Sequence, residues 1–180
     1  VVAGVLCGAV CGAVNGVLVM GLRIPSFIAT LGTLGIYRGI AQTSTGAVAV
    51  PAPALQALRG EIAGIPCVVL VAVLVLVAGG LLLQRMRFGR HTYAIGGNRS
   101  AALLSGVPVG AHVVLGYAFA GLLWGLGVLF YCSQGGSGDP NEYKGLELDV
   151  IAAVVIGGGS LSGGIGTLSG SVAGTFTILL

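Results

Sequence analysis

The sequence predicts an all-α membrane protein, a polytopic bundle of transmembrane helices with one short helix outside the bilayer and one broken glycine-rich segment. Three observations support this fold class. Hydrophobic residues make up 56% of the chain and charged residues only 7%, whereas a soluble domain carries about a quarter charged residues. The charges gather in a few short clusters. The runs between these clusters are long enough to cross a bilayer.

The apolar runs define the expected spans in chain order. A transmembrane helix needs about 20 apolar residues. Runs of close to that length lie at 1–22, 62–83 and 112–132. A shorter run at 27–42 contains Arg38, whose long side chain can reach the interface, so we expect a fourth span there. Residues 1–180 then form a single transmembrane domain, and because both termini lie inside apolar runs we expect it to be truncated at both ends.

The last stretch, 150–180, is apolar but contains six glycines between positions 157 and 166. Such a segment does not form one continuous helix, so we expect a half-helix, an irregular turn and the start of another span. Broken helices of this kind often line a transport path, although a tight turn at the interface explains the glycines equally well. If the segment lines a path, the candidate residues are Gly158, Ser160 and Ser162.

Asn15 is the one strongly polar side chain deep inside an uncharged span. A buried polar group in lipid is costly unless it is paired. Asn15 therefore either forms an interhelical hydrogen bond, which we favour, or lines a water-filled path and joins the candidate path residues. Around it, every fourth residue from Gly4 to Gly16 is glycine, which predicts a seam where another helix packs closely.

The charges of the loops predict the orientation of the chain, because Lys and Arg accumulate on the cytoplasmic side. The segment 85–99 holds four arginines and no acid, so loop 85–111 is expected to be cytoplasmic. The segment 133–149 holds four acids and one lysine, and loop 43–61 holds one arginine and one glutamate. Both of these loops are expected to be extracytoplasmic.

A short helix is predicted within the basic loop. Gly96 and Gly97 break the preceding element, and Asn98 is a favourable N-cap. Residues 100–105 have a short helical pattern, and Gly106 is a favourable stop. A helix of two turns or fewer is unstable alone in water, so its own loop or another protein must hold it.

Three segments resemble one family. The pattern Gly-Arg-x-x-Tyr-Ala-Ile-Gly-Gly-Asn-x-x-Ala-Ala-x-Leu-Ser-Gly-Val at 89–107 resembles the cytoplasmic loop of permeases of the ribose, xylose and autoinducer-2 type, in the ATP-binding-cassette importer superfamily. The segments 27–33 and 147–167 resemble the same family in the same order. The resemblance implies that the short helix is the cytoplasmic coupling helix, which rests on an ATPase subunit. The coupling residues would be Gly96, Gly97, Asn98, Ala101, Ala102, Leu104, Ser105 and Gly106.

The resemblance also implies partners and a place in the cell. The chain would be a multi-pass protein of the bacterial inner membrane that imports a monosaccharide or similar polyhydroxylated solute. It would work with cytoplasmic ATPase subunits, a second permease subunit in a homo- or heterodimer, and an extracytoplasmic solute-binding protein. The chain itself is not expected to be an enzyme, because its only lysine, Lys144, is not in a phosphate-binding loop. The residues indicate no cofactor, metal site, catalytic constellation or nucleic-acid surface.

Two alternatives remain open from the sequence. The first is a permease of the same superfamily for branched-chain amino acids or nucleosides, against which the triplet Gly96, Gly97, Asn98 favours the sugar branch. The second is a secondary carrier driven by an ion gradient. Such a carrier should place ionisable residues inside its spans, and apart from Arg38 these spans have none.

Overall fold

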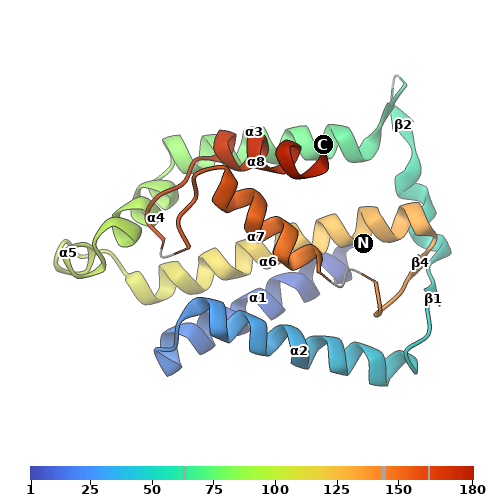
Figure 1. Cartoon of the computed structure of the whole chain (residues 1–180), viewed down its shortest axis with the longest axis horizontal. Coiled ribbons are helices and arrows are strands. Elements are labelled where there is room, and N and C mark those ends of the chain that lie inside the picture. Colours follow the sequence, from blue (N-terminus) through green and yellow to red (C-terminus); the bar gives the residue numbers. More distant parts are fainter. Residues whose placement is uncertain (63, 143–144, 162) are drawn as a thin grey trace. The chain divides into compact units, whose positions relative to one another are not determined.

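The computed structural model describes residues 1–62, 64–142, 145–161 and 163–180. Helices dominate these residues and the strands have two residues each (Figure 1), so the predicted all-α class is confirmed. The α-helices are α1 (Val2–Leu22), α2 (Ser26–Thr45), α3 (Cys67–Arg85), α4 (Arg87–Gly97), α5 (Arg99–Leu104), α6 (Val109–Gly135), α7 (Leu146–Ile156) and α8 (Leu168–Leu179). A 3₁₀ helix, η1 (Pro53–Arg59), and the strands β1 (Val50–Pro51), β2 (Glu61–Ile62), β3 (Ile65–Pro66) and β4 (Ser137–Gly138) complete the list.

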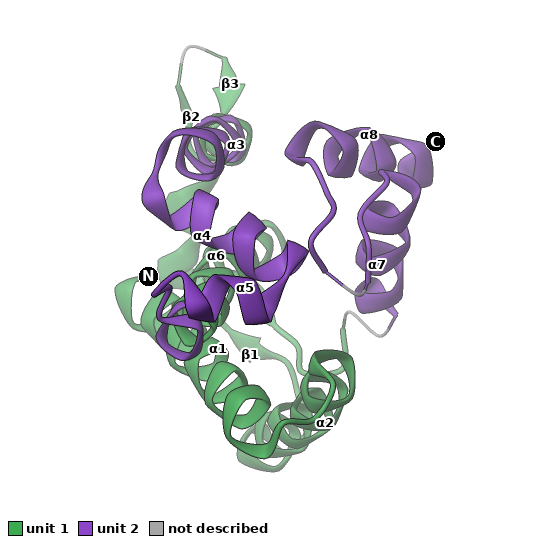
Figure 2. Cartoon of the chain, turned by 90° about the vertical axis from the view of Figure 1, so that its left-hand side faces the viewer, with its two compact units in different colours: residues 1–71, 113–142 green, residues 72–112, 143–180 purple. Residues whose placement is uncertain are grey.

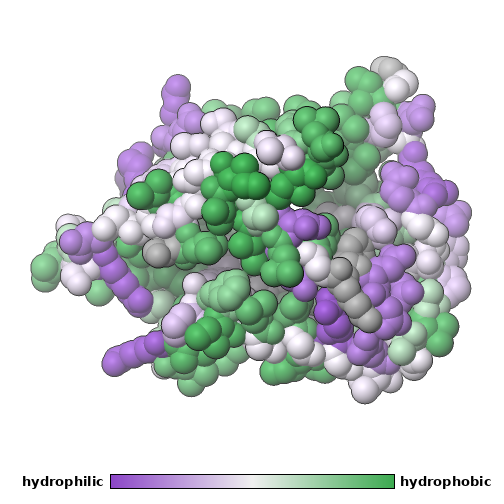
Figure 3. All heavy atoms as spheres, viewed as in Figure 1, coloured by the Kyte–Doolittle hydropathy of each residue, from purple (hydrophilic) through white to green (hydrophobic). Residues whose placement is uncertain are grey.

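Three helices of the described residues, α1, α3 and α6, are long and apolar enough to cross a membrane. Their aliphatic side chains face outward, and in α3 Leu74 and Val77 are 65% and 57% exposed. Figure 3 shows such hydrophobic residues at the surface over the helices. Exposed apolar surface is unfavourable in water but suits lipid, so this is a multi-pass membrane protein. Helix α2 has 20 residues but is less apolar, and the fourth span at 27–42 stays a prediction.

The chain divides into two compact units (Figure 2). Unit 1 holds residues 1–71 and 113–142, and unit 2 holds residues 72–112 and 143–180. The coupling residues expected from the sequence all belong to unit 2.

In unit 1 the glycines of α1 pack against α6, as the sequence predicts. A Cβ atom added to Gly8 would lie 2.4 Å from the carbonyl oxygen of Gly121, and one added to Gly12 would lie 2.1 Å from the carbonyl oxygen of Tyr117. No side chain fits between backbones that approach so closely. The hydroxyl of Tyr37 on α2 donates to the carbonyl oxygen of Cys11 at 3.2 Å, so α1 also contacts α2.

Two loops of unit 1 join at one end of that unit. Strand β1 pairs antiparallel with β4, with Val50 opposite Gly138. The side-chain amide of Asn141 donates to the carbonyl oxygen of Ala47 at 2.9 Å and accepts from Nε2 of Gln42 at 3.0 Å. Within unit 1, residues 43–61 and 133–142 of these loops therefore lie side by side. This is what the sequence requires of two loops that are expected on the same side of the membrane.

In unit 2 the glycine-rich stretch forms a tight helical hairpin. Helices α7 and α8 have 11 and 12 residues, each shorter than a span, and lie side by side (Figure 2). A Cβ atom on Gly157 would lie 2.2 Å from the carbonyl oxygen of Gly170, and one on Gly174 would lie 1.9 Å from that of Ala153. The predicted break between two helical pieces is confirmed, and glycines bring the two helices into backbone contact.

One element of the basic loop is not expected from the sequence. The preceding element does end at Gly97, as the two glycines predict, but it is a helix, α4, that includes both of them. The segment from Arg87, which the sequence presents as loop, is an 11-residue helix. The helix tolerates Gly96 because glycine is needed there for a close backbone contact with Gly164, which outweighs its low helix propensity.

Candidate functional site

Residues at the two ends of helix α5 determine where it begins and ends. The side-chain oxygen of Asn98 accepts a hydrogen bond from the backbone N–H of Ala101 at 2.9 Å, which caps the helix as predicted. At the other end Gly106 has a φ of 78°, and the N–H groups of Gly106 and Val107 donate to the carbonyl oxygens of Leu103 and Ala102, each at 3.0 Å. These two bonds form a Schellman motif. The short helix between Asn98 and Gly106 is therefore confirmed.

The exposed surface of α5 includes two leucines at its C-terminal end. Leu104 is 91% exposed and Leu103 is 56% exposed, while Ala102 is 4% exposed. Leu104 lies outside the three membrane-length helices. A six-residue helix with two exposed leucines next to polar and basic residues is a surface that another protein can cover. Of the residues expected to couple, only Ala102 is buried; the others, Gly96, Gly97, Asn98, Ala101, Leu104, Ser105 and Gly106, are exposed.

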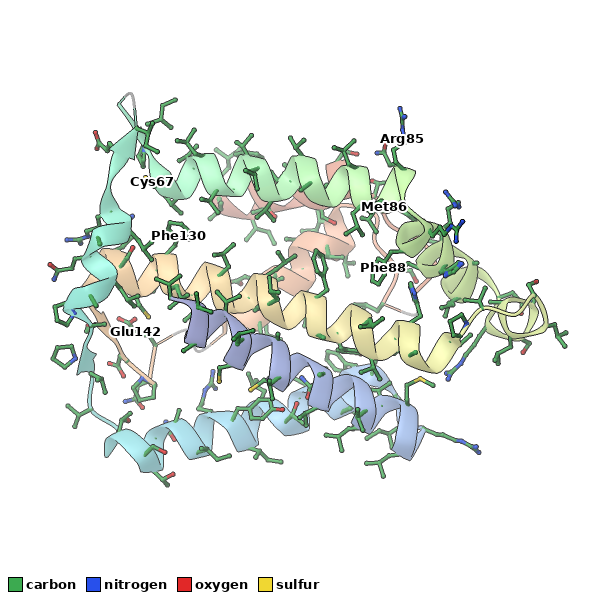
Figure 4. The ribbon with its side chains drawn as sticks, turned by 180° about the vertical axis from the view of Figure 1, so that it is seen from behind. Cys67, Arg85, Met86, Phe88, Phe130 and Glu142 are labelled. Atoms are coloured by element: carbon green, nitrogen blue, oxygen red, sulfur yellow. The ribbon has the colours of Figure 1, made fainter. Side chains whose placement is uncertain are left out.

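Helix α4 holds α5, and contacts within unit 2 hold α4. The hydroxyl oxygen of Thr92 lies 2.9 Å from Nε2 of His112 and 2.9 Å from the carbonyl oxygen of Phe88. The rings of Phe88 and His112 contact each other at a centroid distance of 4.5 Å with an interplanar angle of 37°, and His112 is 8% exposed. Figure 4 shows Phe88 just after Arg85 and Met86, where α3 ends and α4 begins. The start of α6 thus braces one face of α4.

Sequence reasoning missed α4 and its brace. The residues on the braced face recur with a helical period, since Phe88, His91 and Ile95 are all partly buried. That period was the available signal, but the arginines and glycines between these residues gave the segment the composition of a loop.

The expected path residues fall into different units. Asn15 belongs to unit 1, whereas Gly158 and Ser160 belong to unit 2, and each is described within its own unit. Ser162 lies outside the described residues. Gly158 is exposed with a φ of +83°, and the backbone N–H of Ser160 donates to the carbonyl oxygen of Ile165 at 2.9 Å.

Asn15 has a distinctive environment. Its side-chain oxygen is buried and accepts no hydrogen bond from any residue that the structure describes. The interhelical bond favoured from the sequence is therefore not made by this oxygen within the described part of the chain. A buried acceptor without a donor costs free energy, so the site suits a hydroxyl, a water or a donor from another part of the assembly.

Comparison with known proteins gives a consistent result. The family model described as "Branched-chain amino acid transport system / permease component" matches residues 1–180. The autoinducer 2 import system permease protein of Klebsiella pneumoniae is 41% identical over 165 residues, which are 90% of this chain and 48% of that protein. The ribose import permease protein of Bacillus subtilis is 40% identical over 169 residues, 91% of this chain and 52% of that protein.

A third relative is the L-arabinose transport system permease protein of Escherichia coli, 43% identical over 177 residues, which are 97% of this chain and 54% of that protein. The chain thus spans about half the length of the curated relatives that it matches. No solved structure matches it.

Proposed function

Because the chain belongs to the family of branched-chain amino acid transport system permease components, we propose that it is part of the membrane-spanning permease subunit of an ATP-driven importer. The imported solute would be a monosaccharide or a similar polyhydroxylated molecule. The permease would form the translocation path, and separate subunits would hydrolyse ATP. The relatives support this, since their names describe permease proteins of import or transport systems.

The observation that carries the proposal is the exposed leucine on the capped helix α5. Leu104 is 91% exposed on an α5 that is capped at both ends. An apolar side chain presented in this way offers a partner a preformed contact at little entropic cost. We infer that cytoplasmic ATPase subunits cover Leu104, Ala101 and the α5 N-terminus. Ala102, which is buried, would act by seating α5 rather than by touching a partner.

The charge of the loops and the pairing of two loops in unit 1 support the proposed orientation. The arginines at 85, 87, 90 and 99 support a cytoplasmic position for loop 85–111. Loops 43–61 and 133–149 join through β1 and β4, so both would lie outside the inner membrane, where a solute-binding protein can reach them. The path would be completed by a second permease subunit, in a homo- or heterodimer.

The solute class rests on the relatives and on one polar group. Ribose, L-arabinose and autoinducer 2 are in the names of the relatives described above, whereas the family description names branched-chain amino acids. The side-chain oxygen of Asn15, which has no hydrogen-bond partner among the residues that the structure describes, suits a hydroxyl donor of a polyhydroxylated solute. The names of these relatives favour a polyhydroxylated solute over an aliphatic amino acid.

The proposal is tested by uptake assays in cells that lack their own pentose and leucine importers. The complete permease is expressed with its ATPase and solute-binding protein, and uptake of labelled ribose, L-arabinose and leucine is measured. We expect pentose uptake that is lost when the ATPase is omitted. Leucine uptake alone would favour the amino acid branch. Uptake that persists without the ATPase and stops with an ionophore would favour an ion-coupled carrier.

A further inference from the structure

Helix α4 and the glycine-rich segment between α7 and α8 meet backbone to backbone inside unit 2. A Cβ atom placed on Gly96 would lie 2.4 Å from Cα and 2.7 Å from the nitrogen of Gly164. A Cβ atom placed on Gly164 would lie 2.3 Å from the carbonyl oxygen of Gly96. Real Cβ atoms essentially never come closer than 3.0 Å to another heavy atom, so this approach requires glycine on both sides.

A side chain adds a second link at the same place. Tyr93 lies about one helical turn before Gly96, on the same face of α4. Its hydroxyl donates to the carbonyl oxygen of Gly166 at 3.3 Å. The adjacent Gly97 differs, because a Cβ atom there would meet nothing within 4 Å. The contact is therefore confined to one face of α4, opposite residues 164–166.

The glycine-rich segment is itself folded. The N–H of Ser160 donates to the carbonyl oxygen of Ile165 at 2.9 Å, and the N–H of Gly163 donates to the carbonyl oxygen of Ser160 at 3.1 Å. Beyond it, α7 and α8 are in backbone contact at Gly157 and Gly170. On the other side, α5 follows α4 after the single residue Asn98, whose N–H donates to the carbonyl oxygen of Ala94. Close-packed backbones transmit displacement with little compliance.

We propose that Gly96, Gly164 and Tyr93 make α4 and the glycine-rich segment move as one body. Displacement of α5 by an ATPase subunit then reaches α7 and α8 through this contact, without passing along the membrane-length helices. The three residues are positioning residues that couple the ATPase to the half-helices. This inference rests on the proposed function, because it assumes that α5 docks on an ATPase.

The first test separates this contact from a general effect of substitution. Gly96→Ala and Gly164→Ala are made in the complete permease, reconstituted with its ATPase and solute-binding protein. Gly79→Ala in α3 is the matched control for Gly96→Ala, since a Cβ atom there meets nothing within 4 Å. Gly163→Ala is the matched control for Gly164→Ala, since both glycines have a positive φ, of +88° and +82°, and a Cβ atom on Gly163 meets nothing within 4 Å. Alanine favours helix more than glycine does, so Gly96→Ala does not weaken α4. The Cβ atom introduced by Gly96→Ala must instead push the glycine-rich segment away from α4.

We expect both variants to bind the ATPase normally in a pull-down. Solute-stimulated ATP hydrolysis and the maximal uptake rate should fall about fivefold or more, with an unchanged KM for uptake. Tyr93→Phe removes one hydrogen bond and should lower solute-stimulated ATP hydrolysis about twofold. Full stimulation in Gly96→Ala, equal to that of Gly79→Ala, would overturn the inference. An unsubstituted assembly without solute-stimulated hydrolysis would instead refute the proposed function, and the inference with it.

A second test asks whether the two elements move together. Cysteines replace Tyr93 and Gly166 in a permease whose native cysteines are substituted, and a short bis-methanethiosulfonate reagent links them. If the elements move as one body, uptake by the linked protein should be the same before and after reduction of the linker. Uptake that is lost on linking and restored by reduction would show that they separate during transport, and would exclude the proposal.

Discussion

The side-chain oxygen of Asn98 accepts a hydrogen bond from the backbone N–H of Ala101 at 2.9 Å, at the first turn of α5. This bond begins a six-residue helix that is too short to persist without support. The Schellman motif at Gly106 closes the helix, and α4 holds it. Together these contacts give the exposed Leu104 a fixed place before any partner binds.

Removing the cap should loosen the coupling helix. Asn98→Ala leaves the N–H of Ala101 without its acceptor and should destabilise α5 by about 1 kcal/mol, so association with the ATPase weakens. Asn98→Ser restores a capping oxygen and should recover most of the affinity. Titration of ATPase binding to the detergent-solubilised permease measures both. Equal losses in the two variants would mean that the cap is not what Asn98 contributes.

The exposed leucine should matter for binding and not for folding. Leu104→Asp places a charge where an apolar contact is proposed, and a central apolar contact is typically worth about 2 kcal/mol. We expect a loss of ATPase binding with an unchanged melting temperature of the isolated permease. Val48→Asp, at a 65% exposed position in loop 43–61, is the control and should bind the ATPase normally. A Leu104→Asp permease that is still captured fully by the ATPase would contradict the proposed surface.

The hydrogen bonds of Asn141 should hold the paired loops of unit 1 together. Asn141→Ala removes hydrogen bonds to Ala47 and Gln42, each worth about 1 kcal/mol. Loop 43–61 should then be cut faster by a protease added to the solubilised protein. Glu142→Ala, at the adjacent exposed residue, should leave the rate unchanged. Identical cleavage of the two variants would show that β1 and β4 suffice to hold the loops.

The glycine seam of α1 should be intolerant of a single methyl group. Gly12→Ala would place a Cβ atom 2.1 Å from the carbonyl oxygen of Tyr117, and overpacking costs roughly 1–3 kcal/mol. The melting temperature of the solubilised protein should fall. Gly21→Ala, in the same helix but with nothing within 4 Å, should not lower it. If both substitutions had the same effect, the seam would not determine stability.

Local signals in the sequence were sufficient for some parts of the molecule. The N-cap at Asn98 and the stop at Gly106 act within a few residues, so α5 could be predicted from its own sequence. The glycines of α1 recur every fourth residue, and the pattern alone indicates a packed face. The break in 150–180 could likewise be predicted, because its glycines are themselves the cause.

Other parts depend on contacts between distant residues. Helix α4 is stabilised by the contacts of Thr92 and Phe88 with His112. No pattern in the local sequence indicates that His112 is their partner. The contact between Gly96 and Gly164 joins segments from opposite sides of α6 in the sequence. Strands β1 and β4 have two residues each, too few for a periodic signal. Asn15 could be recognised as polar, but not as an acceptor without a donor.

The central claim is that α5 faces the cytosol and is covered by an ATPase. It is tested most directly by labelling a Leu104→Cys permease, otherwise free of cysteine, with a membrane-impermeant maleimide in right-side-out spheroplasts and in inside-out vesicles. We predict no labelling in spheroplasts, and labelling in inside-out vesicles that bound ATPase subunits prevent. Labelling of Cys at position 104 in intact spheroplasts would place α5 outside the cell and contradict the account.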